Sequence, residues 1–225
     1  MSETPDGFVQ RPAEFVPVGA GAQLAPTRWR ALFAVAGVAT VTVLSVAYCV
    51  QGFRRSDRWH EGNGVLPTET AQQLNDTMRQ IGHAIWLALI ASAIGFAWWS
   101  RAIVLNAQRR GVARLSSRIA TFAWFVPWFG LGPAMGQIAR SVEGVGYSAH
   151  RVKWWNLSSR IGLPIVIFVE FTIGASWAQA NNVSEKLDAL DRQELLRSFA
   201  TLWIVCTAVL AIRAIRHADR SVSHF

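Results

Sequence analysis

The sequence predicts an all-α protein, a polytopic transmembrane helical bundle with four to five membrane segments. Of its 225 residues, 52% are hydrophobic and only 16% are charged, whereas soluble domains carry roughly 25% charged residues. The mean hydropathy is +0.24, which is high for a protein that folds in water. The apolar residues gather into runs of up to about 20, and at this length only a helix satisfies its own backbone in lipid.

The first 28 residues predict a flexible cytoplasmic tail, because they are polar, show no periodicity and contain four prolines. We expect the membrane helical domain to cover residues 29–217 and a short C-terminal tail to cover 218–225. The tail does not look like a signal peptide, since the first apolar run starts too late.

Five apolar segments follow the tail, at 31–50, 81–100, 119–139, 161–180 and 198–212. The first, second and fourth have the length of about 20 residues that a bilayer-spanning helix needs. The fifth is about five residues shorter, but Arg197 and Arg213 at its ends can reach to the interface and extend it.

The third segment predicts a broken helix. Pro127, Gly130, Gly132 and Pro133 lie within seven residues of one another, and each interior proline removes a backbone donor and clashes with the preceding turn. The segment therefore either crosses the membrane or dips in and returns, with its freed backbone groups covered by protein or water.

Counting Lys and Arg in the connections separates these two topologies. Five crossings place eleven basic residues on each side, so the positive-inside rule gives no orientation. A re-entrant third segment places fifteen on one side and seven on the other, and eight of the fourteen acidic residues then fall on the poorer side. We therefore favour four crossings with both termini in the cytoplasm, in a bacterial inner (plasma) membrane.

The two connections placed outside carry short amphipathic stretches, at 68–80 and 184–197. We expect both to form helices that lie at the interface and continue into the next span. Ser184 is the expected start of the second of these helices.

Several motifs occur in order along the chain. Trp98 and Arg101 precede Asn106 and Gly111, then Trp124 and Pro127 precede Pro133, and Trp154-Trp155 follows. This succession resembles an uncharacterised family of actinobacterial polytopic membrane proteins, over about residues 30–215. Arg101 stands five residues before Asn106 where the family pattern has four, and the segment between the prolines also departs. The resemblance implies a membrane location and no activity, cofactor or substrate.

A candidate intramembrane polar site comprises Glu170, His83, Arg101 and Asn106. Glu170 lies near the middle of the fourth segment, where an ionised group costs on the order of 2.5–3.5 kcal/mol. It is either a proton or cation site or a protonated side chain hydrogen-bonded to a neighbouring helix. The sequence does not choose its partner.

The basic stretch after the second segment is a candidate contact for anionic lipid headgroups, or simply a solvated loop that fixes orientation. Its candidate residues are Arg109, Arg110, Arg114 and Arg118. Tryptophans near the segment ends indicate aromatic belts. Small residues on one side of the second segment, Ala88, Ser92 and Gly95 among them, predict close helix packing or self-association.

No catalytic, nucleotide-binding or metal-binding motif stands out in the sequence, so we expect no enzyme, no cofactor and no metal. The net charge of +8 is read as membrane topology and lipid contact, without nucleic acid. The favoured function is an inner-membrane envelope or interaction component, with the lipid bilayer and a protein partner or a second copy as its contacts. The alternative is a small transporter or channel that uses Glu170 and the broken segment 119–139.

Overall fold

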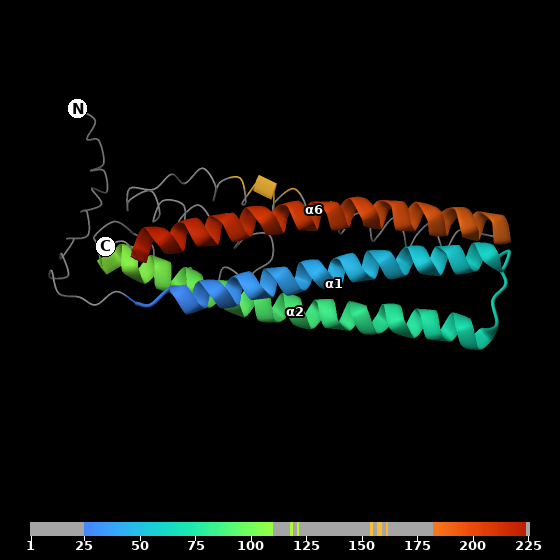
Figure 1. The fold of residues 1–225 in the computed structure, drawn as a ribbon, viewed down its shortest axis with the longest axis horizontal. Coiled ribbons are helices and arrows are strands. Elements are labelled where there is room, and N and C mark those ends of the chain that lie inside the picture. Colours follow the sequence, from blue (N-terminus) through green and yellow to red (C-terminus); the bar gives the residue numbers. More distant parts are fainter. Residues whose placement is uncertain are drawn as a thin grey trace, which may run out of the picture.

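The computed structural model describes residues 25–109, 118, 121, 154, 157–158, 161 and 182–223, and no strand occurs among them. Three long helices make up this part of the chain: α1 (Arg28–Glu61), α2 (Thr68–Arg109) and α6 (Val183–Ser223) (Figure 1). Each is long and apolar enough to cross a membrane. The predicted all-α class and the segments 31–50, 81–100 and 198–212 are thereby confirmed as membrane-compatible helices, whereas nearly all of 119–139 and 161–180 lies outside the described residues.

Helix α1 lies in the middle and packs against both other helices, while α2 and α6 barely touch each other (Figure 1). On one side, Trp29 contacts Trp98 and Gly37 contacts Ser92, so α2 runs antiparallel to α1.

On the other side of α1, Cys49 contacts Ser198 and Ser56 contacts Asp191, so α6 is antiparallel to α1 as well. Helices α2 and α6 therefore run in the same direction.

Small residues set the contact between α1 and α2, so the small-residue face of the second segment is used for packing within the chain, one of the two uses that the sequence left open. A Cβ atom added at Gly37 would lie 2.9 Å from Ser92 Cα, and one added at Gly95 would lie 3.3 Å from Ala34 Cα. Both distances are short enough that the missing side chain is what allows the two backbones to approach.

Burial is inverted relative to a soluble protein. Ala88 and Ser92 are buried on α2, whereas the neighbouring Leu87 and Ile90 are 70% and 55% exposed. Large apolar side chains on α1 and α6 are exposed too. Such a surface suits a hydrocarbon solvent, because lipid tails are as apolar as leucine and only close packing distinguishes a neighbouring helix from lipid.

The bulky part of the core lies toward the Arg28 end of α1. Trp99 is fully buried there, together with Ala34 of α1 and Ile215 of α6. Beside α6, Ser158 accepts a hydrogen bond from Trp203 Nε1 at 3.1 Å and shares a 2.6 Å hydrogen bond with Thr207.

The start of α6 differs from the prediction. Asn182, and not Ser184, caps the helix: its Oδ1 accepts from the backbone N–H of Glu185 at 2.8 Å, and its Nδ2 donates to Glu185 Oε1 at 3.0 Å. This is a reciprocal capping arrangement, which satisfies a donor that would otherwise lack a helical partner. Ser184 thus falls inside the first turn.

The predicted amphipathic stretches are helical and continue into the spans, but they do so without a break, as straight parts of α2 and α6 (Figure 1). They therefore continue along the axes of α2 and α6 and do not form separate helices that turn away from them. At the other end, α6 continues to Ser223, six residues past the boundary at 217 expected for the bundle. Nothing in 218–223 breaks a helix, since this stretch has no proline or glycine.

Candidate functional site

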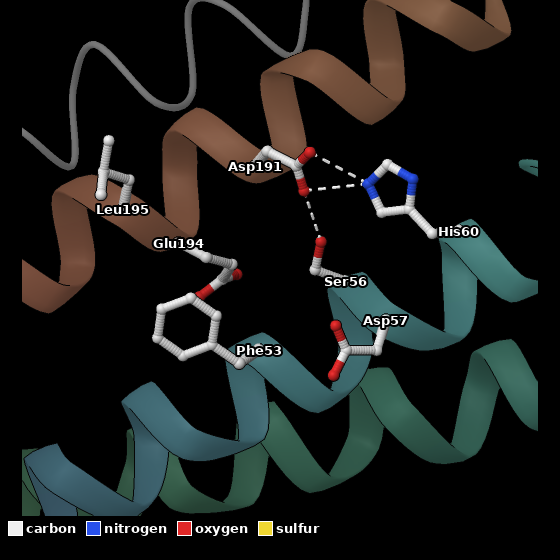
Figure 2. Close-up of a pocket in the computed structure, with 7 residues that line it drawn as sticks. All are labelled: Phe53, Ser56, Asp57, His60, Asp191, Glu194 and Leu195. Atoms are coloured by element: carbon white, nitrogen blue, oxygen red, sulfur yellow. Dashed lines mark hydrogen bonds and ion pairs between the residues drawn. The ribbon is translucent and has the colours of Figure 1, made fainter.

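Polar side chains of α1 and α6 meet just past the apolar stretches, at the end where α6 begins. Ser56 and His60 come from α1, and Asp191 and Glu194 come from α6 (Figure 2). Arg197 follows Glu194 on the next turn of α6. The three α6 residues share one face because they are spaced three residues apart. This face turns toward α1, so the charged groups here form contacts between the two helices.

Glu194 and Arg197 form the most buried ion pair among the described residues. Arg197 Nη1 donates to Glu194 Oε1 at 2.8 Å, and the two side chains are only 9% and 1% exposed. The carboxylate fits because α1 has a glycine opposite: a Cβ at Gly52 would lie 2.6 Å from Glu194 Cδ. The missing side chain of Gly52 thus leaves space on α1 for the Glu194 carboxylate.

Arg197 turns inward, although the sequence predicted that it would extend toward the interface. Its guanidinium carbon lies 5.0 Å from the centre of the Tyr48 ring, a cation–π geometry. The Gln193 amide oxygen, when it faces this arginine, accepts from Nη1 at 3.0 Å. An ion pair supported in this way has several contacts to replace the water it lost.

Asp191 joins the two helices one turn earlier. It accepts a 2.7 Å hydrogen bond from the Ser56 hydroxyl, and His60 Nε2 lies 3.0 Å from each carboxylate oxygen. The Ser56 hydrogen bond, followed by that of His60, lowers the pKa of the Asp191 carboxyl, which lies in the polar part of α6 before the apolar stretch at 198–212. Asp191 is therefore anionic at neutral pH.

An open pocket of about 450 Å³ lies beside these contacts (Figure 2). Its lining combines polar groups with two exposed apolar side chains, and consists of Phe53, Ser56, Asp57, His60, Asp191, Glu194 and Leu195. No group of three metal-ligating side chains occurs in the described parts of the chain. The described site thus contains paired charges that join α1 to α6.

The candidate polar residues from the sequence are not gathered at this site. His83 and Arg101 are exposed on α2, and Asn106 is buried near the end of that helix. His83 and Asn106 are 23 residues apart, which is about 34 Å along a helix. The two side chains therefore cannot meet around Glu170, which lies outside the described residues.

Asn106 has a structural partner that the sequence did not indicate. Its Oδ1 accepts from the backbone N–H of Ala25 at 2.8 Å, and its Nδ2 donates to the Ala25 carbonyl at 3.0 Å. This two-bond contact ties the segment before α1 to the end of α2.

The remaining candidates are distributed as follows. Arg109 is half-buried at the end of α2, and Arg118 is exposed. The others lie outside the described residues, namely Arg110, Arg114, Pro127, Gly130, Gly132 and Pro133.

Sequence reasoning placed Glu194 and Asp191 only on an amphipathic helix. Their spacing relative to Ser198 would have shown that they share one face, but nothing along the chain identifies Gly52 as the residue opposite. The chain matches no protein-family model, no curated protein and no solved structure. The function must therefore be argued from the residues and their arrangement.

Proposed function

We propose that this chain is a multi-pass integral protein of the bacterial inner membrane that acts as an envelope or interaction component without catalysis. The observation that carries the proposal is the length of the three helices together with their apolar exposed faces. They contain 34, 42 and 41 residues, or roughly 50–60 Å each, whereas the hydrocarbon core is about 30 Å thick. Each helix therefore has a polar part outside the lipid.

The polar parts of all three helices lie at the same end of the bundle, where α6 begins. They comprise about residues 54–61 of α1, 68–80 of α2 and 183–197 of α6. The stretches of α2 and α6 extend about 20 Å along their helix axes, and that of α1 extends about 12 Å. Contacts such as that between Ser56 and Asp191 hold α6 against α1 in this region. A rigid, charged helical projection is suited to contact with another protein or a second copy. Some of its ionisable groups, such as Asp191, hold its own helices together.

We further propose four crossings with both termini in the cytoplasm. The parallel directions of α2 and α6 support an odd number of passes between Arg109 and Asn182. Four crossings with a re-entrant third segment leave one pass between these two positions, whereas five crossings leave two, so the parallel directions favour the re-entrant topology.

This topology also agrees with the basic residues. It places fifteen Lys and Arg on the side of the termini and seven on the other, which favours a cytoplasmic location for the richer side.

Cysteine labelling tests the topology. In a background where the native Cys49 and Cys206 are replaced by alanine, single cysteines are introduced as Asn63→Cys, Leu115→Cys and Ser148→Cys and exposed to a membrane-impermeant maleimide in oriented vesicles. We expect positions 115 and 148 to label from the same side and position 63 from the opposite side. Opposite labelling of 115 and 148 would show that the third segment crosses.

Site-specific photo-crosslinking tests the interaction function. A photoreactive amino acid replaces Glu69, on the polar projection, or the lipid-exposed Leu87 as the matched control on the same helix. We expect one discrete stoichiometric protein adduct from position 69 in native membranes and only lipid adducts from position 87. Lipid-only or heterogeneous adducts from both positions would contradict an interaction role for the projection.

A further inference from the structure

A cluster of two tryptophans and one arginine lies at the opposite end of the bundle from the polar projection. Trp29 of α1 and Trp98 of α2 meet edge to face, with ring centroids 4.3 Å apart and planes at 90°. The guanidinium carbon of Arg30 lies 5.5 Å from both ring centroids. Arg30 immediately precedes the apolar stretch 31–50, so the cluster lies at the height of the lipid headgroups.

The charge of Arg30 has no anion in the described part of the protein. No ion pair to it occurs there, and its Nε is buried without a hydrogen-bond partner. The flat face of the Arg30 guanidinium interacts with the two indole rings. The N–H groups along the edge of an arginine guanidinium, five donors in all, suit a phosphate.

The surroundings favour an anionic ligand. At this end the described helices carry seven arginines against one acidic residue: Arg28, Arg30, Arg101, Arg109, Arg213, Arg216 and Arg220 against Asp219. At the other end their polar parts carry seven basic and eight acidic residues, so the formal charge there is near zero. The potential therefore draws negative headgroups specifically to the end that holds the cluster.

We propose that Arg30, Trp29 and Trp98 bind the phosphate of an anionic phospholipid. The phosphate accepts hydrogen bonds from the guanidinium edge, and the half-exposed indole rings pack against the glycerol and upper acyl chain. This inference rests on the proposed membrane location. It adds a specific lipid site to that location, formed by residues other than the headgroup contacts that the sequence predicts in the stretch 109–118.

Lipid titration followed by native mass spectrometry tests the proposal. The full chain in a mild non-ionic detergent is titrated with phosphatidylglycerol or phosphatidylcholine. We expect Arg30→Gln to weaken phosphatidylglycerol binding about fiftyfold, since both a surface charge and charge-assisted hydrogen bonds are lost. The matched control is Arg28→Gln, an exposed arginine on the same helix end, for which we expect a change of about fivefold at most.

Equal losses in the two variants, or no loss in Arg30→Gln, would overturn the site, because they would mean that only the general positive charge matters. Displacement of the lipid by millimolar inorganic phosphate would also overturn it, since the ligand would then be free phosphate. We expect no such displacement.

Two further variants keep the test valid if Arg30→Gln does not fold. Trp98→Leu leaves the charge in place and removes one stacking ring, so binding should weaken about fivefold. Arg30→Lys keeps the charge but loses the planar fork, so it should also weaken binding. Retention of full affinity by both would refute the proposal.

Failure of the membrane assignment is distinguishable from failure of the site. A chain that is folded and monodisperse in buffer without detergent would refute the proposed function. A detergent-dependent chain without preference for phosphatidylglycerol would refute only the lipid site.

Discussion

Two Glu–Arg pairs with the same sequence separation provide a direct test of how the projection is held to the bundle. Glu194 and Arg197 on α6 are three residues apart, with N···O at 2.8 Å, and are nearly inaccessible to solvent. Arg58 and Glu61 on α1 are also three residues apart, at 3.1 Å, but both side chains are 65% exposed. Burial is therefore the main variable between the two pairs.

We expect Glu194→Gln to lower the free energy of unfolding by about 3 kcal/mol, the lower end of the range for removing one partner of a buried pair. The lower end applies because Arg197 keeps the contacts to Gln193 and Tyr48. The matched Glu61→Gln should change stability by about 0.5 kcal/mol or less, because exposed pairs contribute little.

The measurement is unfolding in mixed micelles, with sodium dodecyl sulfate added to the protein in mild detergent and helicity followed by circular dichroism. A difference of 3 kcal/mol corresponds to a change on the order of a hundredfold in the folded-to-unfolded ratio. The double variant Glu194→Gln/Arg197→Gln should recover part of the loss, since it removes the Arg197 charge that Glu194→Gln leaves buried without its carboxylate. Equal stability of Glu194→Gln and Glu61→Gln would refute the assignment of Glu194 as a buried element of the α1–α6 contact.

Three other predictions follow from the packing and from the proposed function. Gly37→Ala should destabilise the fold in the same titration by about 1–2 kcal/mol, because its Cβ would meet the α2 backbone. The control Gly82→Ala, which has nothing within 4 Å of the added Cβ, should be neutral or stabilising. Similar effects of the two substitutions would contradict the packing. Asn106→Ala should accelerate hydrogen exchange at the Ala25 amide, which loses its acceptor, and unchanged protection would show that another group holds this segment. Reconstituted vesicles should show no proton or cation flux that depends on Glu170, so a flux abolished by Glu170→Gln in a folded protein would favour the transporter alternative.

The all-helical class of this fold, with helices long and apolar enough to cross a membrane, was predictable from the sequence because it depends on local properties. The apolar runs at 31–50, 81–100 and 198–212 have the length that a bilayer imposes, and α1, α2 and α6 contain them. That α2 has a face for close packing was also predictable, since small residues such as Ser92 and Gly95 recur on one helical face, but whether α1 or a second copy packs there was not. Composition and periodicity within one segment carry both kinds of information.

The sites depend on pairs of residues far apart in the chain, and periodicity within one segment does not specify such pairs. Glu194 is buried because Gly52, on another helix, leaves room for its carboxylate. Asn106 was grouped with His83 as a polar residue of the membrane domain, yet its partner is the backbone of Ala25. A residue's chemistry was visible in the sequence, whereas its partner followed from the three-dimensional arrangement.

Because small side chains are buried and large apolar ones are exposed, enlarging a buried residue should cost more stability than truncating an exposed apolar one. In lipid there is little hydrophobic driving force between helices, so contact depends on fit. Leu87→Ala, at a position 70% exposed, should leave stability nearly unchanged even though it removes a large apolar side chain. Ser92→Leu, at a position 6% exposed opposite Gly37, should separate α1 from α2 even though it adds apolar surface, at a cost of 1–3 kcal/mol or more. If Leu87→Ala were the more destabilising of the two in mixed micelles, its side chain would be packed against protein, and the exposed face of α2 would have to be a protein interface.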